Sequence, residues 1–301
     1  MRNQIFATTL AAAACFAQSA SFDAFATLSG GELADFRDST PDPDGNTIYF
    51  TAIGPAGAGV FRVPASGGVA STVFAGAPLV NPTGIAMSND GRTLYVADPL
   101  VYAGPRRTGA IFALPVAGGR PLVVRGSEGR APHGIDVDPS REVLFFTGTN
   151  LITRKVGVYR LPAEGSDAPE RVAEGFDIVD PDSVTVARDG TVYVTDRGGR
   201  SGYGSVLKIA DSEVSTILDI MRPGQPAGLA LSLDESTLLV STLQPYRDRA
   251  QVLVVRLDTL ETFAETRVVG ANQGPGGLHR ARNGSVFSWC GQENNVYRVR
   301  P

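Results

Sequence analysis

Apolar and polar residues alternate along this chain in short runs, and the runs come in pairs joined by a tight turn. The clearest pair reads Gly84-Ile85-Ala86-Met87, then a turn at Asp90-Gly91, then Thr93-Leu94-Tyr95-Val96. Alternation with a period of two predicts half-buried strands, and Asp-Gly favours a hairpin because such turns need positive φ. The phrase recurs six times, starting at residues 37, 83, 133, 182, 227 and 276, which are 45 to 50 residues apart. A fixed period of this size indicates a propeller or a solenoid.

Each repeat predicts further strands beyond this hairpin. Third strands are expected at residues 59–63, 110–114, 157–161, 205–209, 252–256 and 295–299, and fourth strands at 71–74, 121–124, 170–173, 215–218 and 266–269. The sixth repeat ends at Pro301 before a fourth strand, so we expect residues 25–30 to supply it and to close the ring. We therefore predict an all-β, six-bladed β-propeller with four antiparallel strands per blade. A helical solenoid is the alternative, and the Val-, Ile- and Tyr-rich runs argue against it.

The first 20 residues have the pattern of a secretion signal, with Arg2, an apolar stretch over residues 5–16 and small residues around Ser19. We expect residues 1–20 to be a signal peptide and residues 21–301 to be a single propeller, exported to the periplasm or out of the cell. Acylation at Cys15, as in a lipoprotein, is the less favoured alternative, because Ala12 stands where a larger aliphatic residue is usual. After cleavage Cys290 would be the remaining cysteine, which excludes an internal disulfide.

The charge balance limits the classes of partner. The formal net charge is -4, which argues against binding to nucleic acid through bulk electrostatics. The apolar stretch over residues 5–16 is too short to span a bilayer, so no membrane span is expected. Nothing in the strand pattern calls for an oligomer, and we expect a monomer.

The start of each first strand is where we place the candidate site. In an antiparallel blade the first strand lines the central channel, so the six starts converge on one channel mouth. The residues there are Arg37, Thr83, His133, Asp182, Ala227 and Gly276. A structural position in a repeat usually keeps its chemistry, so the change to Arg, His and Asp predicts a site carried by the scaffold. We assign His133 and Asp182 as catalytic base and orienting group, and Arg37 and Thr83 as substrate-binding residues.

The alternative is that these polar groups only hydrogen-bond channel water and loop amides. For several other residues we favour a structural role over a role in ligand binding or catalysis. His279 lies on an inner strand, Asp98 and Asp196 end second strands, and Trp289 and Cys290 are expected in the core. We expect the two aspartates to accept hydrogen bonds from loop amides.

The loops between second and third strands should surround the same mouth. They carry eight basic residues and four acidic ones, with Tyr102, Tyr203 and Tyr246 among them. A positive, aromatic-lined mouth would attract a small anionic molecule, such as a carboxylate or a phosphate ester. From these loops the candidate substrate-binding residues are Arg106, Arg154, Arg197 and Arg247.

Residues 82–98, Pro-Thr-Gly-Ile-Ala-Met-Ser-Asn-Asp-Gly-Arg-Thr-Leu-Tyr-Val-Ala-Asp, and the similar residues 181–196 resemble blades of the gluconolactonase/regucalcin (SMP-30) and NHL-repeat propellers. The resemblance implies a six-bladed ring that hydrolyses lactones or other esters with a divalent cation, held by Glu, Asn and Asp at inner-strand starts. This chain has Arg37 in place of the Glu and Ala227 in place of the Asp. His133 and Asp182 are then the candidate metal ligands, and one divalent cation is the candidate cofactor.

The sequence leaves two hypotheses about function. The first is an exported hydrolase of small anionic esters or lactones, with its site at the channel mouth. The second is a non-catalytic propeller that binds an anionic small molecule or a partner protein through the same mouth.

Overall fold

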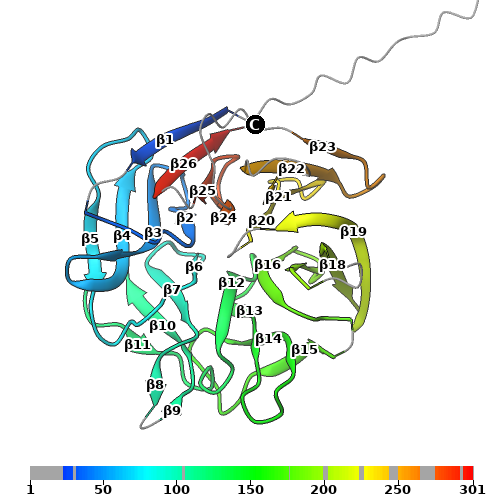
Figure 1. The fold of residues 1–301 in the computed structure, drawn as a ribbon, viewed down its shortest axis with the longest axis horizontal. Helices are drawn as coiled ribbons and strands as arrows, with labels where there is room; N and C mark the ends of the chain where they lie inside the picture. Colours follow the sequence, from blue (N-terminus) through cyan, green and yellow to red (C-terminus); the bar gives the residue numbers. More distant parts are fainter. Residues whose placement is uncertain are drawn as a thin grey trace, which may run out of the picture.

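The fold is a six-bladed β-propeller, in which six blades of antiparallel strands surround a central axis (Figure 1). The computed structural model describes residues 23–29, 32–103, 106–175, 177–198, 203–223, 227–243, 250–264, 275–291 and 294–300. Within these ranges there is no helix, and so none that could cross a membrane. The predicted fold class is confirmed.

The first three blades are formed by consecutive segments of the chain. Blade 1 consists of β2 (Ser39–Pro41), β3 (Thr47–Gly54), β4 (Gly57–Pro64) and β5 (Ser71–Ala75); blade 2 of β6 (Gly84–Met87), β7 (Thr93–Asp98), β10 (Ala110–Pro115) and β11 (Leu122–Val123); blade 3 of β12 (Pro132–Val137), β13 (Val143–Thr149), β14 (Val156–Pro162) and β15 (Glu170–Glu174). A short ribbon of β8 (Tyr102–Ala103) and β9 (Arg106–Arg107) projects from blade 2.

The next two blades share one continuous sheet. Blade 4 consists of β16 (Pro181–Val186), β17 (Val192–Asp196), β18 (Gly204–Ala210) and β19 (Glu213–Pro223); blade 5 of β20 (Leu229–Leu231), β21 (Thr237–Leu243), β22 (Ala250–Arg256) and β23 (Thr262–Ala264). The end of β19 pairs with β21 through Arg222 and Pro223, which joins the two blades. The strand expected at residues 266–269 lies outside the described residues, and β23 pairs with β22 just before it.

The last blade is closed by the beginning of the chain. It consists of β24 (Pro275–Arg280), β25 (Phe287–Gly291), β26 (Asn295–Arg300) and β1 (Asp23–Ser29). β1 pairs antiparallel with β26, from Asp23 opposite Arg300 to Ser29 opposite Asn295. The prediction that an N-terminal strand completes the sixth blade is confirmed. Closure also covers the edge of β26, which would otherwise offer unpaired backbone groups.

The hydrophobic core is divided among the blade interfaces. Each of six clusters of buried side chains combines residues from two neighbouring blades. Trp289 lies in the cluster between blades 5 and 6, and Cys290 lies in the one between blades 6 and 1. Both are fully buried, as predicted. Burying each large side chain contributes roughly 1.5–3 kcal/mol, so the ring is stabilised evenly around its circumference.

Glycines allow the inner strands to approach one another closely. A Cβ atom at Gly84 would collide with the carbonyl oxygen of His133, and one at Gly134 would collide with that of Asp182. Gly228 faces the backbone of β24 in the same way. This contact explains why glycine recurs after the variable residue in the repeat.

Removing β1 should open the ring. We expect deletion of residues 1–29 to lower the free energy of unfolding by at least about 3 kcal/mol, because the backbone hydrogen bonds between β1 and β26, worth about 1 kcal/mol each, are lost. Urea denaturation measures the loss, and size-exclusion chromatography should show aggregation through the exposed β26 edge. Deletion of residues 1–20 alone is the control and should leave both unchanged. Equal stability of the two truncated proteins would contradict the closing role of β1.

Candidate functional site

The six inner-strand starts do meet at one mouth of the channel. The Thr83 hydroxyl donates a hydrogen bond to the His133 carbonyl oxygen at 3.1 Å, and the amide of Gly277 donates one to the Arg37 carbonyl oxygen at 3.0 Å. The amide of Ala227 donates to Asp182 Oδ2 at 2.8 Å. These contacts join adjacent blades, so the ring predicted from the repeat is present. They also give Thr83 and Asp182 a structural role there.

Asp182 and Arg197 form the most enclosed charged pair of the mouth. Asp182 is the second residue of β16, and Arg197 follows the end of β17. Arg197 Nε lies 3.6 Å from Asp182 Oδ2, while Arg197 Nη2 lies 2.9 Å from Asp180 Oδ2. The Asp182 side chain is only 4 % exposed, whereas that of Asp180 is 52 % exposed. One guanidinium therefore joins a buried carboxylate to an exposed one.

Burial raises the pKa of Asp182 to about 7, although the Arg197 charge and the Ala227 amide act in the opposite direction. Desolvation disfavours the charged form of a carboxyl, and here it outweighs both stabilising partners. Asp182 thus titrates near neutral pH.

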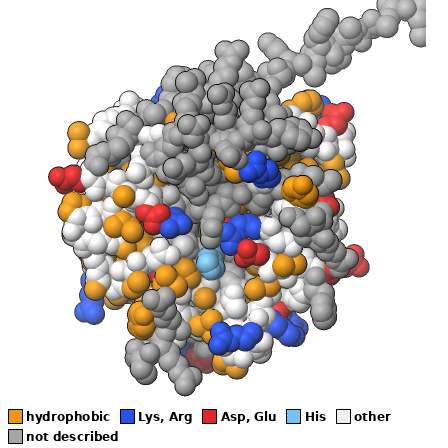
Figure 2. Space-filling model, viewed as in Figure 1, with side chains coloured by type: hydrophobic (Ala, Val, Ile, Leu, Met, Phe, Trp, Pro, Cys, Tyr) orange, Lys and Arg blue, Asp and Glu red, His pale blue; other side chains and the backbone are white. Residues whose placement is uncertain are grey.

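His133 lies beside this pair without bonding to Asp182. Its pKa is lowered by burial and further by the Arg197 charge, while Asp180 opposes the shift. His133 is therefore neutral at neutral pH. Among the described residues no hydrogen bond joins its ring to Asp182, whose Oδ2 is directed to blade 5. Figure 2 shows one face of the disc with a histidine near its centre and basic and acidic side chains beside it.

Arg37 repeats the pattern of Arg197 on blade 1. Its Nη2 lies 2.7 Å from Asp35 Oδ2, and the two side chains are 27 % and 39 % exposed. The Nε atoms of both Arg37 and Arg197 are buried and have no hydrogen-bond partner among the described residues. That of Arg197 faces the Asp182 carboxylate as an ion-pair partner at 3.6 Å.

The described side chains of this mouth do not provide the ligand atoms that a divalent cation needs. The oxygen of Asp182 already accepts from Ala227 and neighbours the Arg197 guanidinium, and the Arg37 guanidinium would repel a metal. A calcium ion needs six or more oxygen ligands. Among the described residues no three His, Cys, Asp or Glu side chains are grouped to hold a metal. His133 and Asp182 thus do not fit the ligand set of a divalent cation.

The mouth loops are described in part. Arg154 is exposed on the loop after β13, and Tyr102 and Tyr203 are each 52 % exposed. Arg247 lies outside the described residues, and of Arg106 only the backbone in β9 is described.

Asp98 and Asp196 hold these loops in place. Asp98 accepts hydrogen bonds from the amides of Val80, Asn81 and Leu100. Asp196 does the same for the loop before β16, accepting from the amides of residues 179, 180 and 198. Their predicted structural role is confirmed.

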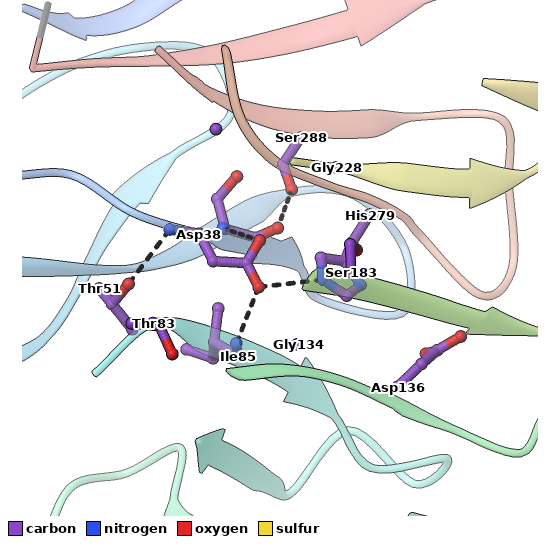
Figure 3. A network of polar contacts seen from close by, with 12 residues as sticks. Asp38, Thr51, Thr83, Ile85, Gly134, Asp136, Ser183, Gly228, His279 and Ser288 are labelled. Carbon is purple, nitrogen blue, oxygen red and sulfur yellow. Dashed lines mark hydrogen bonds and ion pairs between the residues drawn. The ribbon is translucent and has the colours of Figure 1, made fainter. Parts of the chain in front are cut away.

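Below the mouth lies a buried pair that the sequence did not reveal. His279 Nε2 is 3.2 Å from Asp38 Oδ2, and this oxygen also accepts from the amide of Ile85 at 2.9 Å (Figure 3). Burial lowers the pKa of His279, but the charge and hydrogen bond of Asp38, with Asp136, outweigh it and raise the pKa overall. The expected structural role of His279 is thus confirmed. Asp38 and His279 link blades 1, 2 and 6.

Comparisons with known proteins support the fold. No protein-family model matches the sequence, and no curated protein matches it. Among solved structures, a protein of Agrobacterium tumefaciens assigned as TolB has a TM-score of 0.64 at 17 % identity, covering 93 % of this chain and 97 % of that one. A Thermus thermophilus protein assigned as an oxidoreductase (glucose dehydrogenase) has a TM-score of 0.64 at 16 % identity, covering 92 % and 99 %.

A chain of the nidogen/laminin complex has a TM-score of 0.61 at 17 % identity, covering 81 % of this chain and 84 % of that one. At these identities the likeness shows the propeller fold alone. Membership of the gluconolactonase or NHL family stays a prediction.

The raised pKa of Asp182 gives a pH-dependent stability. Its folded pKa of about 7 lies above the ordinary value of 3.8, so the folded state holds a proton that the unfolded chain has released between these pH values. Stability contributed by this group is complete below the unfolded pKa and is lost as pH rises toward 7. We expect the Asp182→Asn variant to lack this loss. The free energy of unfolding of the wild type minus that of the variant, measured by urea denaturation, should therefore decrease between pH 5 and pH 8.

Thr195→Val, at a buried hydroxyl of β17 that does not titrate, is the control for this pH series. Its difference from wild type should stay constant with pH. A difference for Asp182→Asn that is flat over the same range would contradict the assignment.

Proposed function

We propose that this protein is an exported, ligand-binding propeller whose channel mouth takes up a small molecule bearing a carboxylate or phosphate group. The observation that carries the proposal is the pair of half-buried guanidiniums, Arg37 and Arg197, each of which has an exposed carboxylate as its Nη2 partner. Guanidinium groups bind carboxylates and phosphates through two parallel hydrogen bonds. A carboxylate or phosphate of a ligand can take the place of Asp35 or Asp180 at these guanidiniums.

The two guanidiniums differ in how firmly they are held. Arg197 lies between buried Asp182 and exposed Asp180, so a ligand carboxylate can replace Asp180 while Asp182 still fixes the guanidinium. Arg37 has only the exposed Asp35 among the described residues. Arg197 is therefore the main anchor, and Arg37 is the auxiliary one.

His133 adds a neutral polar group next to this anchor. A neutral imidazole both donates and accepts a hydrogen bond, which suits a hydroxyl group of the ligand. The ligand class that fits best is a small hydroxy acid or its phosphate ester. Tyr102 and Tyr203 add exposed aromatic surface on the mouth loops.

Isothermal titration calorimetry with gluconate and with inorganic phosphate tests the proposal at low salt. We expect one of these anions to bind, and Arg197→Gln to weaken binding at least tenfold, about 1.4 kcal/mol. Arg160→Gln is the matched control, because Arg160 also pairs with an exposed carboxylate, Glu170, but lies on β14. Its affinity should equal that of wild type. Equal weakening by both substitutions, or binding that survives Arg197→Gln, would overturn the proposal.

Hydrolysis of small esters or lactones is the second candidate function. The observation that favours it is the pair of opposite pKa shifts, which brings the titration of Asp182 to about 7 and lowers the pKa of His133. Such shifts cluster at sites of acid–base catalysis. His133 would take a proton from the attacking water, and Arg197 would stabilise the negative charge that develops on the carbonyl oxygen.

Initial rates with p-nitrophenyl acetate and gluconolactone measure this activity directly. We expect His133→Ala to lower kcat at least a hundredfold, since general-base catalysis contributes about 100- to 10,000-fold. Folding of the variant is checked by circular dichroism. Turnover by wild type that His133→Ala and Asp182→Asn both retain would place the chemistry elsewhere.

A further inference from the structure

The far end of the channel contains a small polar cavity. There the inner strands end, and the hairpins between first and second strands close the disc; all six of these hairpins are described. The cavity leaves about 50 Å³ for water-sized molecules, and its lining includes Asp136, Glu235, His279, Arg280 and Arg282. We call this region the channel floor. On this measure one water needs about 10–15 Å³, so the space is that of a few waters.

Arg282 spans the floor. Its Nη2 donates to the carbonyl oxygens of Met87, at 3.2 Å, and Val137, at 3.1 Å, at the ends of β6 and β12. Its Nε is buried and has no hydrogen-bond partner in the described part of the chain. The carbonyls fix the position of the guanidinium but carry no net charge to compensate it.

Arg280 brings a second guanidinium to the same cavity. Its Nε donates to the carbonyl oxygen of Leu231 at 2.9 Å, and its Nη1 donates to those of Ala281 and Gly284. As for Arg282, the partners are backbone carbonyls. Burial lowers the pKa of Arg280; the charges of Asp136 and Glu235 oppose this, and those of Arg282 and Arg188 lower it further. Two guanidiniums therefore lie near each other, among charges of both signs.

The acidic groups around the floor are already engaged. Asp136 Oδ1 accepts from the amide of Val137, and its Oδ2 accepts from the hydroxyl of Thr185 and the amide of Val186. Glu235 accepts from the Arg188 amide and lies 3.6 Å from Arg188 Nε.

Among the described residues, most carboxylates near the cavity have a partner of their own. Asp38 is hydrogen-bonded to His279, and Glu235 lies against Arg188. Asp136 is then the carboxylate left beside Arg280 and Arg282. Arg282 Nε is a buried N–H without an acceptor among the described residues, and leaving such a group unpaired is costly.

We propose that the channel floor binds one small monovalent inorganic anion of the size of chloride, with Arg282 Nε and the Arg280 guanidinium as its donors. The anion supplies the acceptor that Arg282 Nε lacks and places a second negative charge beside the two guanidiniums. A volume of about 50 Å³ is too small for an organic acid. The site lies at the opposite end of the channel from the mouth, and the anion acts as a structural counter-ion that ties the blade 6 hairpin to blades 2 and 3.

Crystals of the purified protein soaked in sodium bromide test the position of the anion. We expect an anomalous difference peak in the cavity, within hydrogen-bonding distance of Arg282 Nε. Thermal unfolding in sodium chloride, with sodium methanesulfonate keeping ionic strength constant, tests binding in solution. A ligand that binds the folded state raises Tm with its concentration, by roughly 1–3 °C per tenfold increase for a chain of this size.

Arg282→Gln should abolish the chloride response, whatever it does to Tm itself. Arg141→Gln is the matched control, because Arg141 lies on the same face but is exposed and paired with Asp138. It should respond to chloride as wild type does. If Arg282→Gln does not fold, the bromide peak and the wild-type response decide. A cavity without a peak, or a peak with a Tm independent of chloride, which means binding at crystal concentration only, would overturn the proposal.

Discussion

The whole structure depends on hydrogen bonds that cross from one blade to the inner-strand segment of the next. Every blade boundary has one: Asp38 to the Ile85 amide, Thr83 to the His133 carbonyl, Asp136 to the Val186 amide, Asp182 to the Ala227 amide, Ser241 to the Gly276 carbonyl, and Ser288 to the Ser39 carbonyl. At four of these boundaries a glycine also brings the blades close together: Gly84, Gly134, Gly228 and Gly277. Unsatisfied buried polar groups there would each cost about 1–3 kcal/mol. The apolar clusters between blades supply the stabilisation, and these bonds fix the spacing of the blades.

This ring of bonds changes how the variable positions of the repeat are understood. Variation among Arg, Thr, His and Asp at the inner-strand starts predicts a ligand site carried by the scaffold. Thr83 and Asp182, however, also hydrogen-bond to the next blade, one through a hydroxyl donor and the other through a carboxylate acceptor. Within the described ranges, Arg37 and His133 make no such link between blades through their side chains. Fewer of the variable residues are therefore available to bind a ligand than the sequence indicates. Arg197, which the sequence offers only as one of many loop arginines, is held by a buried carboxylate and becomes the best-positioned cation.

The local pattern of the sequence predicts the fold because strand alternation, turns and period all express local rules. The closing strand, the buried Trp289 and Cys290, and the loop-holding roles of Asp98 and Asp196 follow from the same repeat. The Asp38–His279 pair does not, since its members are 241 residues apart and meet only when the ring closes. An aspartate in the degenerate first repeat gives no sign of its partner in the last.

The two ends of the channel treat positive charge in different ways. At the mouth, Arg37 and Arg197 each have an exposed carboxylate partner, so that partner can return to water when a ligand replaces it. At the floor, Arg280 and Arg282 are held by carbonyl oxygens, which satisfy hydrogen bonds but leave the charge. An exposed carboxylate can exchange with an anionic ligand. Backbone carbonyl oxygens, in contrast, leave the guanidinium charge to be balanced by another group. The same side chain, arginine, therefore suits a replaceable ligand at one end and a resident anion at the other.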